Sequence, residues 1–293
     1  MGGYRAKRLE FYRARGGVIY GARRTLERGN RLPSVTQLIH DSTRPRYNKP
    51  LTVRGSFLFL SDIEIPFHNA QFINNVFAVA KAYNIRQCVI GGDWFHFEAF
   101  SPWPGADQDA EQEIDEIDEH LPEFLQPFDK LYYFLGNHDA RVVKVMERKL
   151  RADQALRMVI APKLAQEFER KVETTSNWWM LASHNWELSH APKNRNMPAT
   201  TAKALAEARR KNVIQAHTHK WGMLQDVSGR LVAIESGCCV DIEKLRYANE
   251  MHSPSTAMVN GAVLMLDTGT LYKPLLLSPL VTDFDYEIRK AKR

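Results

Sequence analysis

The chain has 293 residues, of which 44% are hydrophobic and 25% charged, and its formal net charge is +6. This length and composition exclude a disordered polymer and predict one large folded domain with an appendage. The sequence has no run of about 18 uncharged apolar residues, and its N-terminus is too rich in arginine for a secretory signal, so we expect an intracellular, cytoplasmic protein with no membrane span. Two of the three cysteines are adjacent, which fits a reduced compartment better than a disulfide framework.

The first 54 residues are strongly basic. They hold 13 Lys and Arg against 3 Asp and Glu, a net charge of +10, which leaves −4 for the other 239 residues. Arginines interleaved with tyrosines and phenylalanines suit phosphates and stacked bases, so nucleic acid is the partner we expect here. The same pattern also allows a solvated arm or one that packs on a partner. We divide the chain into a basic, helical N-terminal extension (1–54) and a main domain (55–293), with a helix start near Pro33.

Three apolar runs in the first half of the main domain end in side chains that can bind metals or move protons. Such short runs are typical of parallel strands buried on both faces. An open α/β sheet gathers its site at the carboxyl ends of its strands, so we expect these ends to lie together. The runs are residues 57–60, followed by Asp62 and Glu64; residues 88–90, followed by Gly92 and Asp93; and residues 131–135, followed by Gly136, Asn137, His138 and Asp139.

Two later strand-like runs end in imidazoles. Residues 186–189 lead to His190, and residues 213–216 lead to His217 and His219. His190 is preferred over the nearby His184 because His190 closes a strand-like run. We therefore expect five strand ends to line one crevice.

The order of the elements predicts the α/β class. Apolar residues at helical spacing predict a crossover helix over 70–83 and an acidic helix within 107–125, whereas strand-like alternation dominates after residue 219. Alternating strands and helices followed by strands suggest two packed sheets with flanking helices. The acidic helix presents a solvated face, or it holds the basic extension within the chain or across an oligomer. The aromatic segment 94–104 is a substrate lip or packing beneath a loop.

Taken together, these strand ends resemble the ordered motifs of the calcineurin-like metallophosphoesterases. The resemblance covers roughly residues 56–277 and leaves the basic region outside. Segments 61–68 and 237–241 look most like the branch of this family carried by bacteriophages and prophages. The resemblance implies a sandwich of two mixed β-sheets flanked by helices and a centre for two divalent metal ions.

The resemblance also implies the ligands of the two ions. Asp93 would bridge them, Asp62 and His219 would complete the first site, and the second site would take Asn137, His190 and His217. A mixture of imidazole, carboxylate and amide donors suits Mn, Fe, Zn or Ni better than Mg or Ca alone, and manganese is the metal we expect first.

One position departs from the family pattern. Where the family has a histidine two residues after the first aspartate, this chain has Glu64. A glutamate can still bind a metal, but it adds negative charge and a harder donor, so the first site would shift towards Mn or Mg, bind through water, or lose occupancy. His68 is a candidate substitute, although it fits the following turn better.

The chemistry implied by the resemblance is in-line attack on phosphorus by a metal-bridging hydroxide. His138 matches the family's catalytic histidine, which meets the phosphate or protonates the leaving oxygen. Asp139 would orient His138 by accepting a hydrogen bond. Arg141 either helps to hold a phosphate or is a surface arginine at a helix start.

We expect a metal-dependent phosphoric ester hydrolase that cleaves phosphodiesters, with nucleic acid as the substrate class. The hydrolytic part rests on the strand-end residues, and the nucleic-acid part rests on the basic extension alone. A phosphomonoesterase acting on phosphoproteins or small molecules is the alternative, because the same core supports both chemistries. A metal-binding scaffold with weakened catalysis is the third hypothesis. A homo-oligomer or a protein partner fits any of these.

Overall fold

The computed structural model describes residues 49–101, 109–145, 152–245 and 258–292. The basic extension therefore lies outside the described residues, apart from its last six, and so does the helix expected near Pro33. Within the described ranges, no helix is long and apolar enough to cross a membrane.

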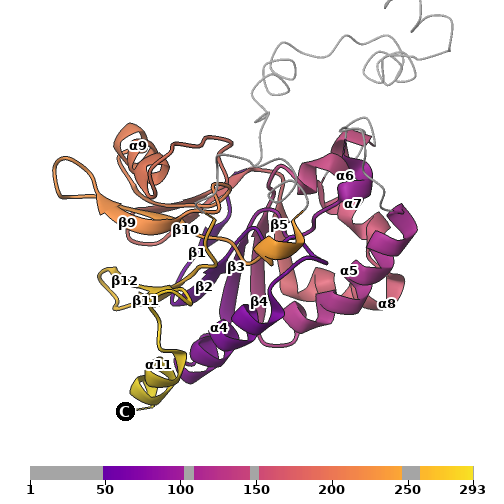
Figure 1. Cartoon of the computed structure of the whole chain (residues 1–293), viewed down its shortest axis with the longest axis horizontal. Helices are drawn as coiled ribbons and strands as arrows, with labels where there is room; N and C mark the ends of the chain where they lie inside the picture. The colour runs from indigo at the N-terminus through magenta and orange to yellow at the C-terminus, as the bar shows by residue number, and fades with distance from the viewer. Residues whose placement is uncertain (1–48, 102–108, 146–151, 246–257, 293) are drawn as a thin grey trace, which may run out of the picture. The chain divides into compact units, whose positions relative to one another are not determined.

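One six-stranded sheet carries the first strands of the main domain (Figure 1). Strands β2 to β5 are parallel to one another. Strand β11 pairs antiparallel with β2, and β12 pairs antiparallel with β11. In spatial order the strands are β12 (Tyr272–Leu277), β11 (Ala262–Asp267), β2 (Phe57–Leu60), β3 (Gln87–Gly91), β4 (Lys130–Phe134) and β5 (Val172–Thr175).

The second six-stranded sheet is also mixed. Strands β7, β8 and β10 are mutually parallel, whereas β6 and β9 run antiparallel to their neighbours β7 and β10. The order is β1 (Thr52–Val53), β6 (Trp179–Ala182), β7 (Trp186–Ser189), β8 (Asn212–Gln215), β10 (Val232–Ser236) and β9 (Trp221–Gln225). Strand β1 lies before residue 55, so the sheet begins slightly earlier than the expected domain boundary.

Alternation of side chains along the strands explains how the two sheets stack. In β2, Phe57 and Phe59 face the second sheet, where they pack with residues such as Met180 and Ile214. The intervening Leu58 and Leu60 belong instead to the core that the first sheet forms with its helices. Each face of the first sheet is therefore buried.

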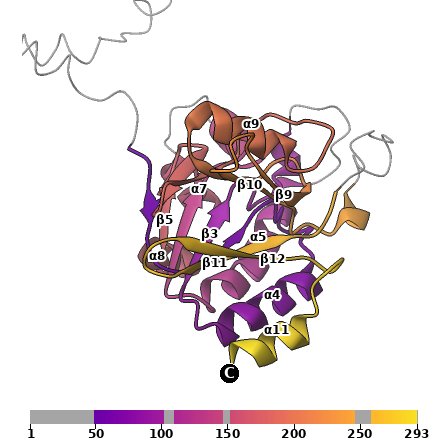
Figure 2. The ribbon, with the colours of Figure 1, turned by 90° about the vertical axis from the view of Figure 1, so that its left-hand side faces the viewer.

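Helices cover the outer faces of both sheets (Figures 1 and 2). Helix α9 packs on the second sheet through a small separate cluster, and α11 lies beside α4 at one end. The sandwich of two mixed β-sheets flanked by helices is confirmed. The helices are α4 (Ala70–Ala82), α5 (Ala110–Leu125), α6 (Asp139–Val145), α7 (Ala152–Val159), α8 (Pro162–Lys171), α9 (Thr200–Arg209) and α11 (Phe284–Ala291), with short 3₁₀ helices η1 (Glu98–Phe100) and η2 (Ile242–Lys244).

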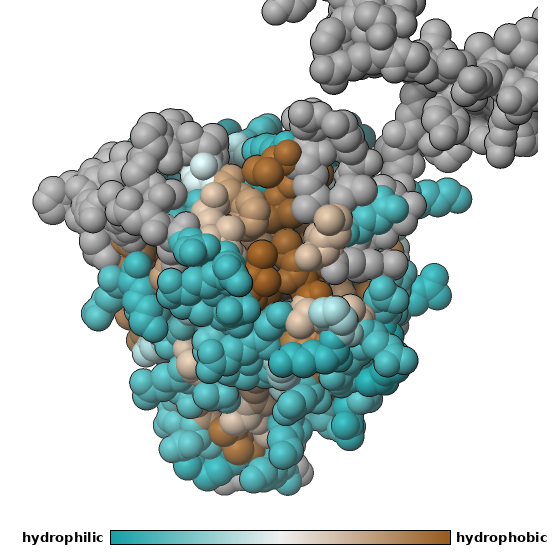
Figure 3. All heavy atoms as spheres, turned by 90° about the vertical axis from the view of Figure 1, so that its right-hand side faces the viewer, coloured by the Kyte–Doolittle hydropathy of each residue, from teal (hydrophilic) through white to brown (hydrophobic). Residues whose placement is uncertain are grey.

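Apolar side chains of the aromatic segment and of the acidic helix are part of the core. Trp94, Phe95 and Phe97 are fully buried, so this part of the aromatic segment is core packing and not a lip. Helix α5 buries Ile117 and Leu121. Figure 3 shows the face of the molecule that α5 to α8 cover, where apolar residues gather towards the upper middle and polar residues lie below them.

Candidate metal centre

The ends of β2, β3 and β4 from one sheet and of β7 and β8 from the other meet at one place. The backbone there is unusual, because several non-glycine residues adopt the left-handed region that side chains disfavour. Such conformations cost about 1–3 kcal/mol each and are typical of functional sites. The predicted ligands with positive φ are Asp62 (49°), Glu64 (54°), Asp93 (51°), His217 (72°) and His219 (55°).

Asp93, His190 and His217 form one group of donors. Their ligand atoms all lie within 4.8 Å of one another. His190 Nδ1 donates to the carbonyl of Gly91 at 2.8 Å, which leaves Nε2 facing Asp93 Oδ2 at 3.1 Å and Asn137 Oδ1 at 3.3 Å. A ring held in this way presents a fixed nitrogen, as metal-binding histidines do.

The residues of this group shift one another's pKa values. Burial alone lowers the pKa of His190, but the carboxylates of Asp93 and Asp62 raise it to about 9. Burial would raise the pKa of Asp93, yet His190 and His138 hold it well below its usual range. Burial, and then the charge of His190, lower the pKa of His217 to about 4. His217 is therefore neutral at pH 7, the form that binds metals.

Asp62, Glu64 and His219 form the second group. His219 Nε2 lies 3.2 Å from Asp62 Oδ1 and 3.4 Å from Glu64 Oε1. The side chains of Asp62 and Glu64 are fully buried. Neither Asp62 Oδ1 nor Glu64 Oε1 accepts a hydrogen bond from the described residues. Buried carboxylate oxygens need a positive partner, so a divalent ion between these atoms fits the donors present. The other oxygen of Asp62 accepts the backbone N–H of His217 at 3.1 Å, which links the two groups.

His96 is the site residue that the sequence analysis missed. Its ring bridges two carboxylates, with Nδ1 2.6 Å from Glu64 Oε2 and Nε2 2.9 Å from Glu98 Oε2. Burial lowers the pKa of His96, but these hydrogen bonds raise it to about 9. Burial raises the pKa of Glu64, but the neighbouring His138 and the hydrogen bond with His96 bring it down to about 2. The pair is therefore ionic, and it leaves Oε1 of Glu64 turned towards His219.

His138 and Arg141 lie together at the edge of the centre. The backbone N–H of His138 donates to Asp93 Oδ1 at 2.8 Å, and its ring Nδ1 lies 3.1 Å from the carbonyl of His96. Nδ1 thus carries the proton, and the free Nε2 faces Arg141 Nη2 at 3.5 Å. Burial lowers the pKa of His138, which keeps the ring neutral. Arg141 also donates to the carbonyl of His96 at 2.8 Å, so it belongs to the centre and is not a free surface arginine.

Asp139 does not orient His138, and that expectation is wrong. Its carboxylate instead accepts four backbone N–H groups. Oδ2 takes those of Asp93 at 2.7 Å and Gly136 at 2.8 Å, and Oδ1 takes those of Trp94 at 3.1 Å and Phe95 at 3.3 Å. Burial, and then the negative charge of Asp93, raise the pKa of Asp139. Asp139 therefore fastens the end of β3 to the end of β4.

Two other histidines lie outside the centre. His184 pairs with Asp267, with 2.9 Å between Nε2 and Oδ1. His68, the candidate substitute for the missing family histidine, instead contacts Glu123 of α5, with 3.8 Å between Nε2 and Oε2. Neither supplies a donor to Asp62 or Glu64 among the described contacts.

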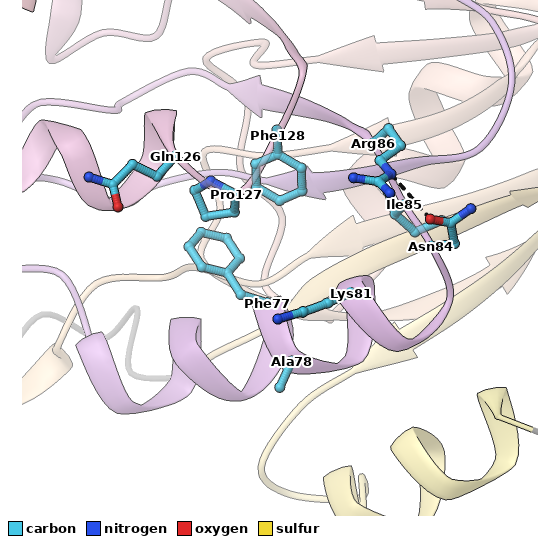
Figure 4. Close-up of a pocket in the computed structure, with 9 residues that line it drawn as sticks. All are labelled: Phe77, Ala78, Lys81, Asn84, Ile85, Arg86, Gln126, Pro127 and Phe128. Atoms are coloured by element: carbon cyan, nitrogen blue, oxygen red, sulfur yellow. Dashed lines mark hydrogen bonds between the residues drawn. The ribbon is translucent and has the colours of Figure 1, made fainter.

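A cavity of about 600 Å³ lies near the amino ends of β3 and β4 (Figure 4). It is lined by the C-terminal half of α4 and by the segments that lead into β3 and β4, including Lys81, Arg86 and Phe128. Arg86 Nε donates to Asn84 Oδ1 at 3.1 Å there. The cavity adjoins the amino ends of the strands, so it is separate from the centre at their carboxyl ends.

Comparison with solved structures finds Vps29 proteins. A single mutant of Vps29 from Entamoeba histolytica aligns with a TM-score of 0.36 and 12% identity, over 76% of this chain and 98% of that one. Vacuolar Protein Sorting 29 from Cryptosporidium parvum aligns with a TM-score of 0.36 and 10% identity, over 76% of this chain and 96% of that one. No protein-family model and no curated protein matches the chain. A likeness of this degree assigns no activity, so the function has to be argued from the side chains.

Proposed function

We propose that the protein is a metal-dependent phosphoesterase that hydrolyses phosphodiesters, with nucleic acid as the substrate class. The observation that carries this proposal is the pair of donor groups joined by Asp93 and Asp62. One group offers two imidazoles, a carboxylate and an amide. The other offers an imidazole and two carboxylate oxygens that accept no hydrogen bond within the described part of the chain. Mixed nitrogen and oxygen donors of this kind suit first-row divalent ions such as Mn²⁺.

Asp93, Asn137, His190 and His217 would hold one ion, and Asp62, Glu64 and His219 the other. Bound divalent ions supply a Lewis acid that stabilises charge on phosphoryl oxygens and lowers the pKa of water. His190 is kept in place by the carbonyl of Gly91 at 2.8 Å, so its donor nitrogen needs no reorganisation on binding. The number and identity of the ions are part of the proposal.

His138 would handle the proton of the leaving group. Because Nδ1 is engaged by the carbonyl of His96 at 3.1 Å, Nε2 is the nitrogen available to a substrate. Arg141, 3.5 Å from that nitrogen, would bind a non-bridging phosphate oxygen beside it. The cationic Arg141 would neutralise charge on the phosphoryl group, whereas His138 would take up a proton from solvent at Nε2 before giving it to the leaving oxygen.

The nucleic-acid part of the proposal is supported by the net charge of +10 on residues 1–54, nearly all of which lie outside the described residues. Membership of the bacteriophage-associated branch, a protein or homo-oligomeric partner, and a cytoplasmic location stay predictions from the sequence.

The test is hydrolysis of bis-p-nitrophenyl phosphate and of p-nitrophenyl phosphate, compared with Mn²⁺, Mg²⁺, Zn²⁺ and Ni²⁺. We expect faster turnover of the diester, and a loss of about 10²–10⁴-fold in the His138→Ala variant. A preference for the monoester would move the assignment to a phosphomonoesterase. Absence of turnover with every metal would leave a metal-binding scaffold.

A further inference from the structure

Three side chains outside the metal centre form a second cluster of metal-binding groups. His68 lies in the segment between β2 and α4, whereas His120 and Glu123 belong to α5. The two α5 residues are three positions apart, so they share one face of the helix. One ligand atom from each of the three side chains lies within 4.8 Å of the other two.

The three groups face one another closely. His120 Nδ1 is 3.0 Å from Glu123 Oε1, and His68 Nε2 is 3.8 Å from Glu123 Oε2. The imidazole centroids are 4.7 Å apart, with the rings inclined at 73°. Two nitrogens and a carboxylate are a common donor set for zinc and similar ions when water fills the remaining positions.

His68 is held in place before any ion arrives. Its side chain is only 3% exposed, its backbone bridges to Val240, and its ring lies 5.7 Å from that of Phe124. Its Nδ1 has no hydrogen bond among the described residues. Burial, and then the charge of His120, lower the pKa of His68, so the ring is neutral and offers a lone pair.

The open side of the cluster faces solvent. The side chains of His120 and Glu123 are 29% and 49% exposed, which leaves room for an ion with its water ligands. Lys244 also lowers the pKa of His68, but its ammonium pairs with Asp241 at 3.6 Å and is not one of the three groups.

We propose that His68, His120 and Glu123 bind one divalent transition-metal ion, such as Zn²⁺, at a site separate from the metal centre. The ion would join α5 to the segment that carries Glu64, four residues before His68. Binding there stabilises the folded chain by mass action, so the thermal midpoint rises with Zn²⁺.

The experiment is equilibrium dialysis of the full chain against Zn²⁺, followed by metal analysis of the protein. We expect His120→Ala and Glu123→Ala each to hold one zinc ion fewer per chain than the unmodified protein. Both side chains are partly exposed, so the variants should fold, and circular dichroism checks this. Glu119→Ala, at an exposed position of the same helix, is the matched control and should keep the full zinc content.

Unchanged zinc content in His120→Ala and Glu123→Ala would overturn the proposal, and so would an equal loss in Glu119→Ala, since that indicates unspecific binding to an acidic helix. The measured quantity is a difference in bound zinc and does not use turnover. It therefore stays informative if the protein hydrolyses no phosphate ester.

Discussion

Asp93 joins the parts of the candidate centre at the level of single residues. One oxygen accepts the backbone N–H of His138 at 2.8 Å, and the other faces His190 Nε2 at 3.1 Å. The backbone carbonyl of Asp93 accepts the N–H of Ile63 and of Glu64, which fixes the turn after β2. A single side chain and its own peptide group therefore set the positions of donors from three strands.

His96 should be a positioning residue for Glu64. We expect His96→Ala to weaken Mn²⁺ binding by about 10–100-fold, the usual effect of losing a partner of a metal ligand, and to lower diester turnover with it. Isothermal titration with Mn²⁺ measures the first effect. His184→Ala is the control, because it removes another imidazole–carboxylate pair, 2.9 Å from Asp267, that does not belong to the metal centre. Equal behaviour of the two variants would contradict the assignment.

Asp139 should contribute mainly to the stability of the fold. Each of its oxygens accepts two backbone N–H groups, so an amide NH₂ at either position would face two donors. We expect Asp139→Asn to lower the free energy of unfolding by about 1–3 kcal/mol, the cost of unsatisfied buried groups. Urea unfolding measures it. Asp226→Asn, which alters a carboxylate with backbone donors at an exposed turn, should cost less because water replaces the lost bonds. A larger loss in Asp226→Asn would refute this ranking.

The sequence predicted the residues of the centre better than their contacts. Asp62 and Asp93 follow apolar runs and His190 follows a strand-like run, and a strand end is a local pattern. His96 follows no such pattern, since its partner Glu64 is 32 residues away and meets it only through the fold. The role of Asp139 was mistaken for the same reason, because its donors lie 44 to 46 residues earlier as well as next to it.

At the scale of the elements, glycines allow the strand ends to come together. A Cβ on Gly136, after β4, would lie 2.1 Å from Asp93 Oδ1 and 2.6 Å from its backbone nitrogen. A Cβ on Gly92, after β3, would lie 2.4 Å from His190 Nδ1. The ends of the two strands can approach to this distance only without side chains at these positions.

Gly136→Ala should therefore displace Asp93. We expect a lower thermal midpoint and loss of Mn²⁺ binding. Differential scanning calorimetry with and without the metal measures both effects. Gly222→Ala, in β9, is the matched control because its Cβ would have ordinary contacts of 3.6 and 3.7 Å. Wild-type metal binding in Gly136→Ala would show that the ends of β3 and β4 are not as tightly placed as described.

The elements that sequence patterns missed are short, polar or peripheral. Strand β1 has two residues, β5 reads Val-Glu-Thr-Thr, and β9 is an edge strand with three exposed residues at its end. Tertiary pairing makes strands of them, with no apolar run to predict it. Residues 140–169, where the sequence pattern predicts one or two helices, contain α6 and α7 on either side of residues outside the described ranges, and Pro162 begins a further helix, α8.

At the scale of the molecule, two sheets bring their strand ends to a common place. The first supplies β2, β3 and β4, and the second supplies β7 and β8. The sequence predicted two sheets and a convergence of strand ends. It could not predict the spatial order of the strands, since β11 inserts next to β2 across more than 200 residues of chain.

The basic extension should bind nucleic acid and should not be needed for hydrolysis at the metal centre. Deletion should stop at residue 48, because Thr52–Val53 form part of the second sheet. We expect the shortened chain to keep its turnover of bis-p-nitrophenyl phosphate and to bind single-stranded DNA more weakly and with a smaller dependence on salt. Fluorescence anisotropy at several salt concentrations measures this, and unchanged affinity would remove the extension from the account.

Metal removal and return test the central claim most directly. The protein is stripped with a chelator, and Mn²⁺ is added back while bound metal and diester turnover are followed together. The account predicts no turnover in the stripped protein, recovery as the centre fills, and neither binding at the centre nor recovery in Asp93→Asn. Full turnover in the stripped protein, or recovery in Asp93→Asn equal to that of the unmodified chain, would contradict it.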